Sequence, residues 1–153
     1  MVITPHALVG ASLATTTDNY YVAFLLGFLS HFLVDMIPHL DPGTFFEDRN
    51  QKWPVWVYIY VFSEIIIFPI VFYFLFRHRS DFAIIVVGAV GGITVDIFDG
   101  NPISAFLKNW PVFKQLHWLH ERLHFYINKR YWYWGLLTEL VIIGGTLWYL
   151  LKY

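Results

Sequence analysis

The sequence predicts an all-α, polytopic membrane protein with about five transmembrane or re-entrant helices and one interfacial helix. Of its 153 residues, 58% are hydrophobic, 21% are aromatic and only 14% are charged, which is too apolar for an ordinary soluble domain. The apolar residues gather in five segments, and no linker divides the chain. We therefore expect residues 1–153 to form a single membrane-embedded domain.

The five apolar segments differ in length. Residues 5–17 are short enough to be re-entrant, residues 20–37 are about long enough to span, and residues 53–76 form the clearest span. Residues 82–98 are short and glycine-rich, and residues 131–151 close the chain. Tryptophan and tyrosine cluster at the segment ends, where aromatic rings anchor among lipid headgroups.

The stretch between the last two segments is too polar to cross a membrane and predicts one or two helices at its surface. With five alternating segments, seven of the ten Lys and Arg residues fall on one side, together with the N-terminus. The positive-inside rule assigns that side to the cytoplasm. Six of the seven histidines share it, and only His78 lies on the other side. This sorting predicts one site in the cell membrane that faces the cytoplasm.

Charge and composition exclude several classes of partner. A net charge of -1 without a long basic run does not favour nucleic acid. The chain has no cysteine, which excludes disulfides and thiolate metal sites. The N-terminus "MVITPHALVG" lacks the positive region of a secretory signal, so we expect it to belong to the mature fold.

The stretch "SHFLVDMIPHLD" places ionisable residues where a segment should finish crossing the membrane. His31, Asp35 and His39 recur every four residues, close to one helix face, although Pro38 is expected to kink or end the helix before His39. An ionisable pair inside an apolar segment is costly, so His31 and Asp35 indicate a functional site. Asp41, taken alone, fits a cap or an interfacial residue.

The stretch "HWLHERLH" carries a second group of candidate ligands. His117, His120, Glu121 and His124 occupy one stripe about 100° wide on a helix. A solvated surface face is the alternative reading, but three histidines at this spacing are a poor choice for mere solubility. Histidine nitrogen combined with carboxylate oxygen, without sulfur, suits zinc, manganese or iron.

A weak internal repeat indicates a second aspartate that can contribute a carboxylate to the site. "GFLSHFLVDMIP" and "GAVGGITVDIFD" both place Val-Asp eight residues after a glycine, at Asp35 and Asp96. Two such helices are expected to bring carboxylates to one pseudo-symmetric centre, although one short match can arise by chance. Asp99 follows Asp96 by three residues. Glu64 and Glu139 lie in mid-segment, where structural pairing or an interhelical hydrogen bond is the expected role.

An early histidine, a Pro-x-x-Asp motif, a later aspartate and a final histidine cluster resemble the small membrane-bound metal-dependent hydrolases of bacteria and archaea. The spacings "HFLVD" and "HWLHE" are also similar to the metal motifs of the zinc-dependent phospholipase C and P1 nuclease fold, which cleaves phosphate esters. That resemblance implies His31, Asp35, His117 and Glu121 as metal ligands.

These observations predict a metal-dependent phosphohydrolase that acts on a lipid phosphate ester. Two or more divalent ions, with zinc favoured over manganese or iron, are expected to polarise the phosphoryl group and activate water. Asp96 is the expected bridging carboxylate or general base, and His120 or His124 the expected proton donor. The expected ligands are His6, His31, Asp35, His39, Asp99, His117 and Glu121. The residues expected to attract the headgroup are Lys108, Lys114 and Arg122.

Two other classes stay open on sequence alone. A haem-binding electron carrier would pair His31 with a histidine of the 117–124 stripe, but has little use for so many carboxylates. A divalent-metal transporter would need acidic groups near the middle of the membrane on both sides, and the clustering is one-sided.

Overall fold

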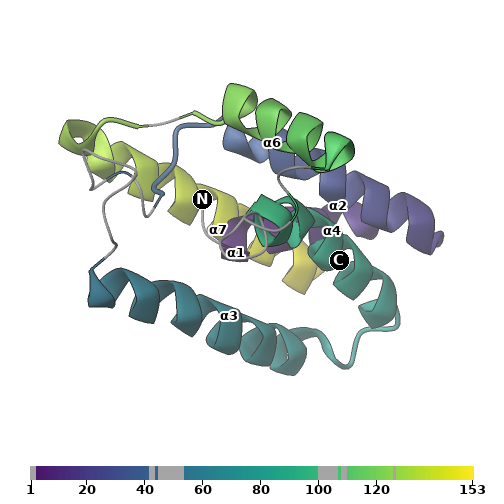
Figure 1. Ribbon diagram of the computed structural model, residues 1–153. Helices are drawn as coiled ribbons and strands as arrows, with labels where there is room; N and C mark the ends of the chain where they lie inside the picture. The colour runs from purple at the N-terminus through teal and green to yellow at the C-terminus, as the bar shows by residue number, and fades with distance from the viewer. Residues whose placement is uncertain (1–2, 42–43, 45–53, 100–106, 108–109, 126) are drawn as a thin grey trace.

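The computed structural model describes residues 3–41, 44, 54–99, 107, 110–125 and 127–153, without the side chain of residue 99. This part of the chain is helical and contains no β-strand, which confirms the all-α expectation (Figure 1). Its elements are α1 (Ile3–Ala14), α2 (Tyr20–Asp35), α3 (Val55–Phe76), α4 (Phe82–Asp99), α6 (Pro111–Leu123), the 3-10 helix η2 (Lys129–Tyr131) and α7 (Trp132–Lys152).

Five of these helices coincide with the five apolar segments, but they differ in their ability to cross a membrane. Val55–Phe76 and Lys129–Lys152 are long and apolar enough to span one, whereas Ile3–Ala14, Tyr20–Asp35 and Phe82–Phe98 are shorter. The structure therefore supports membrane association through two helices and does not confirm a count of five spans.

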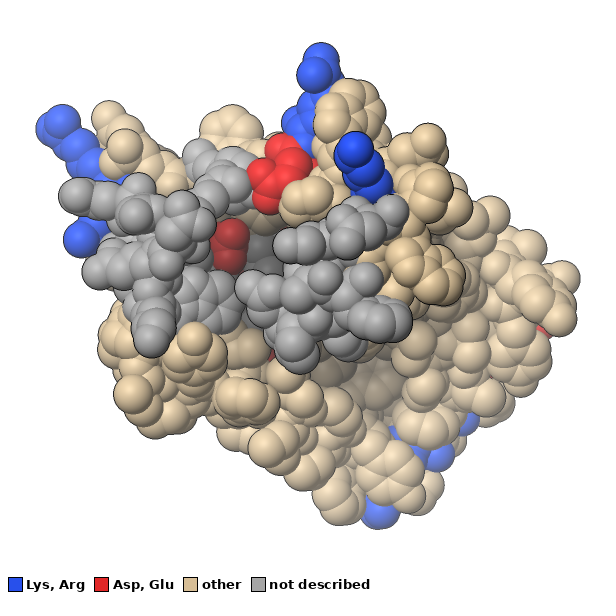
Figure 2. All heavy atoms as spheres, in the orientation of Figure 1, with Lys and Arg blue, Asp and Glu red and all other residues tan. Residues whose placement is uncertain are grey.

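The two long helices expose their apolar side chains. Only 11% of the residues in the most apolar 18-residue stretch of α3 and 17% of those in that of α7 are buried. Neither helix is therefore the buried core helix of a soluble protein. Ile59, Phe62 and Val141 are each more than half exposed. In Figure 2, Lys and Arg lie at opposite ends of the molecule, separated by a broad surface of other residues. Such an extended apolar surface is typical of a membrane-facing protein.

Helices α1, α2 and α4 pack closely through glycines. A Cβ atom on Gly27 would overlap the carbonyl oxygen of Gly88, and one on Gly88 would overlap the carbonyl oxygen of Gly10 and the Cβ of Ala14. The neighbouring core positions are mostly alanines and small aliphatic residues. Small residues let helix backbones approach each other, which is how helices associate where lipid removes the hydrophobic drive.

The glycine contacts fix the direction of the helices. Gly27 of α2 meets Gly88 of α4, and one turn further on the His31 imidazole contacts the carbonyl oxygen of Gly92 at 2.8 Å. Thus α2 and α4 run parallel and in register, while α1 runs the opposite way and brings its N-terminal end to the same place. The internal repeat corresponds to this parallel pair.

Helix α7 is attached at both of its ends. Near its start, the Thr138 hydroxyl donates to the carbonyl of Pro38, and near its end the Arg79 guanidinium donates to the carbonyl of Leu150. Helix α3 lies along the lower side of the molecule in Figure 1, and α6 lies on the other side, beside the end of α2.

The glycine packing predicts that alanine lowers stability at a closely packed glycine but not at a glycine with open space around it. Gly88→Ala should lower stability by about 1–3 kcal/mol, because the new methyl group meets backbone that cannot give way. Gly144→Ala is the matched control, since nothing lies within 4 Å of its added Cβ, and it should be neutral or stabilising by up to about 1 kcal/mol. Thermal unfolding in detergent, followed by circular dichroism, measures both. Equal stability of the two variants would contradict the packing described.

Candidate metal centre

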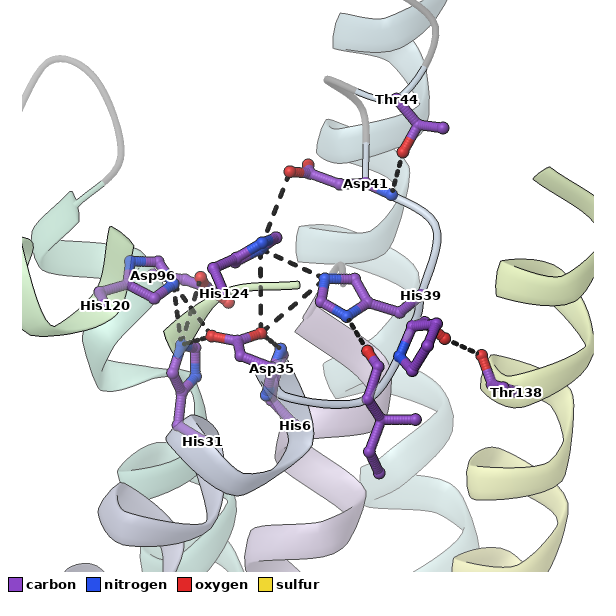
Figure 3. Close-up of polar contacts among 12 residues, drawn as sticks. His6, His31, Asp35, His39, Asp41, Thr44, Asp96, His120, His124 and Thr138 are labelled. Carbon is purple, nitrogen blue, oxygen red and sulfur yellow. Dashed lines mark hydrogen bonds and ion pairs between the residues drawn. The ribbon is translucent and has the colours of Figure 1, made fainter. Parts of the chain in front are cut away.

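Five histidine side chains surround the buried carboxylate of Asp35 (Figure 3). They come from four parts of the chain: α1, α2, the turn after α2, and the end of α6. The five are His6, His31, His39, His120 and His124.

The two oxygens of the Asp35 carboxylate face different histidines. Its Oδ2 lies 3.0 Å from the Nε2 atoms of both His31 and His120. Its Oδ1 lies 3.3 Å from His6 Nε2, 3.9 Å from His39 Nε2 and 4.0 Å from His124 Nε2. Asp35 therefore stands between two sets of nitrogen atoms, one for each oxygen.

Local structure explains why these side chains converge. His31 and Asp35 are four residues apart on α2, so both point from the same face. Helix α2 ends at Asp35, three residues before Pro38, since residues that precede proline disfavour helical backbone; the chain then turns and brings His39 back. The amide of Phe125 donates to the main-chain carbonyl of Asp35 at 2.8 Å, which holds the end of α6 over α2.

Backbone carbonyls orient two of the imidazoles. His31 Nδ1 donates to the Gly92 carbonyl at 2.8 Å, and His39 Nδ1 donates to the Ile37 carbonyl at 2.7 Å. In a neutral imidazole, the Nε2 atom then carries the lone pair. Metal-ligating histidines are usually oriented by a second hydrogen bond of this kind.

The Nε2 atoms of two histidine pairs face each other at a distance at which one ring can donate a hydrogen bond to the other, or both can bind one ion. His31 Nε2 is 3.5 Å from His120 Nε2, and His39 Nε2 is 3.2 Å from His124 Nε2. Burial lowers the pKa of His39 to about 3 and also lowers the pKa of His124. Both imidazoles are therefore neutral at neutral pH, which is the form that binds metals.

The Asp35 carboxylate itself requires a positive charge. Both of its oxygens are buried, and the partners nearest to them are the ring nitrogens of His31, His120 and His6. An isolated buried carboxylate is very unfavourable unless it is paired or binds a metal ion. Three groups of residues can hold such an ion, because the ligand atoms within each group lie within 4.8 Å of one another. They are His6, His31 and Asp96; His31, Asp35 and His120; and Asp35, His39 and His124.

Asp96 lies at the edge of this cluster, whereas the sequence suggested it as the bridging group. Its Oδ1 atom is 3.7 Å from His31 Nε2, and its Oδ2 is buried without a hydrogen-bond partner in the described part. Asp35 lies between the histidine nitrogens instead, because it follows His31 by four residues on the same helix face. Asp41, read from sequence as a cap, reaches His124 Nε2 at 3.8 Å.

Helix α6 divides its polar stripe between the cluster and the surface. His120 and His124, predicted as catalytic residues, contact Asp35. His117 and Glu121, predicted as ligands, are exposed and belong to none of the ligand groups found among the described residues. The helix is rotated so that only one edge of the stripe faces α2, a rotation that helical spacing alone does not reveal.

The predicted headgroup residues lie on or near the same helix. Lys114 and Arg122 are exposed on α6, and the Arg122 guanidinium lies 5.5 Å from the centre of the Trp118 ring. Lys108 and the side chain of Asp99 lie outside the described residues.

Comparison with known proteins gives no match: no family model, no curated protein and no solved structure is significantly similar to this chain. Its function must therefore be inferred from the residues of the cluster.

Substituting a residue that belongs to two ligand groups should lower the metal content more than substituting a residue that belongs to one group. Asp35→Ala should abolish most metal binding, because two of the three groups contain Asp35 and each lost ligand weakens binding strongly. His39→Ala should remove only the ion of its own group. His78→Ala, at the far end, should retain all of the metal. Elemental analysis of the purified proteins measures the ratio, and equal metal content in Asp35→Ala and His78→Ala would refute the site.

Proposed function

We propose that the protein is a membrane-embedded, metal-dependent phosphohydrolase that acts on a lipid phosphate ester. The observation that carries this proposal is the position of the Asp35 carboxylate between two sets of histidine nitrogens. A carboxylate with one oxygen toward each set is the arrangement that bridges two metal ions. The mixed nitrogen and oxygen donors favour zinc, with manganese or iron as alternatives.

Each part of the cluster has a separate task in this proposal. Two divalent ions bound there would supply Lewis-acid polarisation of the phosphoryl group and an activated water. Asp35 and the histidines hold those ions at fixed positions. The buried Oδ2 of Asp96 has no partner in the described part, so it can accept a proton at the edge of the cluster.

The location of the cluster supports a lipid substrate. Two of its histidines come from α6, whose Trp110, Val112 and Trp118 side chains are more than half exposed. A helix with a polar face and exposed tryptophan is typical of the membrane surface. A centre beneath such a helix, at one end of the apolar helices, is positioned to meet lipid headgroups.

The geometry is less favourable for the two alternative functions. The ring centroids of His31 and His120 are 5.2 Å apart, and those of His39 and His124 are 4.6 Å apart, which leaves no room for a haem macrocycle between either pair. Metal transport would need ligands toward the other end of the helices, where Arg79 and Asp81 form an ion pair with each other at 2.7 Å.

Asp96→Asn tests the chemistry. The substitution keeps the shape of the side chain but removes its ability to accept a proton, so hydrolysis should fall by about two orders of magnitude. Metal held by the two groups around Asp35 should remain. The assay follows phosphate or headgroup release from a panel of lipids, with added metal and with chelator. Parental activity in Asp96→Asn, or no turnover of any lipid phosphate by the parent, would refute the proposal.

The side of the membrane is tested by labelling, because the chain has no cysteine of its own. Gln115→Cys, exposed on α6, should resist an impermeant thiol reagent added to intact cells, since the Lys and Arg count predicts that this side faces the cytoplasm. His78→Cys, at the other end, should react. Labelling of Gln115→Cys but not of His78→Cys would show that the centre faces the outside of the cell.

A further inference from the structure

A second polar cluster lies among the apolar helices, next to the metal centre. Glu64 of α3 accepts hydrogen bonds from the amide and the hydroxyl of Thr4, at 3.2 and 3.3 Å. This interhelical bond agrees with the structural role that the sequence suggested for Glu64. The Tyr60 hydroxyl, one turn earlier on α3, also donates to the Glu64 carboxylate and lies near Glu139.

Glu139 of α7 completes this acidic cluster, which we define as Tyr60, Glu64 and Glu139. Its side chain is only 7% exposed, and it lies beside the backbone of Leu40. Its Oε1 atom is buried and has no hydrogen-bond partner among the described residues. The negative charges of Glu64 and Asp41 act on it from nearby.

Within the described residues, no Lys or Arg forms an ion pair with Glu64 or Glu139. Glu64 bonds to the N-terminal turn of α1 through Thr4. A second carboxylate held beside it, with one oxygen unpaired, is unfavourable in a site of low polarity unless a cation or a proton is bound.

The acidic cluster and the metal centre share the same backbone segments. Thr4, which bonds to Glu64, precedes the ligand His6 by two residues. Leu40, which lies beside Glu139, directly follows the candidate ligand His39. The acidic cluster and the candidate metal centre therefore adjoin each other at one end of the helices.

From this juxtaposition we infer that the acidic cluster binds the ammonium group of a zwitterionic phospholipid headgroup whose phosphate lies at the metal centre. The inference rests on the proposed function and narrows its substrate class. The donor set fits an organic ammonium, because two carboxylates attract the charge and the half-exposed ring of Tyr60 offers an aromatic face. Helices α3 and α7, which carry the acidic residues, are the two described helices that are long and apolar enough to cross a membrane.

A binding experiment without metal tests this subsite apart from catalysis. The protein is stripped with chelator in a nonionic detergent and titrated calorimetrically with dodecylphosphocholine and with dodecyl phosphate. Glu139→Gln and Glu64→Gln should each weaken dodecylphosphocholine binding about tenfold, the usual loss for one charged hydrogen bond. Dodecyl phosphate has no ammonium group, so without metal it should bind weakly and equally to the parent and to both variants. Asp18→Asn, which removes an exposed carboxylate elsewhere, should bind both probes as the parent does.

Other occupants give different results. Equal binding of dodecylphosphocholine by the parent and both glutamine variants would overturn the inference and leave a proton shared by the two carboxylates. Displacement of the probe by sodium but not by tetramethylammonium would also overturn it, because the cluster would then be a site for a free inorganic cation.

A turnover experiment separates this inference from the proposed function. With metal restored, Glu139→Gln should raise KM about tenfold for a zwitterionic lipid while leaving kcat and the KM of an anionic lipid unchanged. Loss of kcat for both lipids would overturn the subsite and indicate a structural role. If the parent hydrolyses no lipid but the binding difference persists, the phosphohydrolase proposal fails while the ammonium site stands.

Discussion

The buried carboxylate of Asp35 is the constraint around which the rest of the structure is arranged. Taking an ion out of water costs several kcal/mol even after the protein relaxes, and among the described residues the partners of the Asp35 oxygens are histidine ring nitrogens. A cation held by Asp35 and these histidines would offset that cost. Because those histidines come from α1, α2, α6 and the turn after α2, a metal ion bound there also joins helices that are far apart in sequence.

The glycine contacts of α1, α2 and α4 make this arrangement possible. Gly92 lies against the main chain of His6 and accepts the hydrogen bond of His31, so one backbone position sets the distance between two ligands. Ligand geometry must be held to about half an ångström for metal chemistry to proceed. Close packing through Gly10, Gly27 and Gly88 supplies that rigidity in helices too short and too apolar to lock together by polar contacts.

The sequence was informative where composition and spacing decide the outcome. The five apolar segments match five helices, because an apolar run with helical spacing has few other options. His31 and Asp35 were recognisable because ionisable residues in an apolar helix are costly. The sequence did not reveal that Asp35 rather than Asp96 is central, or which edge of the α6 stripe faces inward. Both depend on helix rotation and on a turn after Pro38, which are set by tertiary contacts.

For Glu64 and Glu139 too, the sequence did not reveal how close the side chains lie to the histidine cluster. Their mid-segment positions predicted only structural pairing or an interhelical hydrogen bond, yet Glu64 bonds to Thr4 and Glu139 lies beside Leu40, each within two residues of a candidate ligand. Because α1 begins at the level of the cluster and the chain after Pro38 folds back against α7, depth along a segment does not give distance from the site. In the proposal, metal ions bound among the histidines would supply positive charge beside the acidic cluster, and a zwitterion is the ligand whose two charges would satisfy both sites at once.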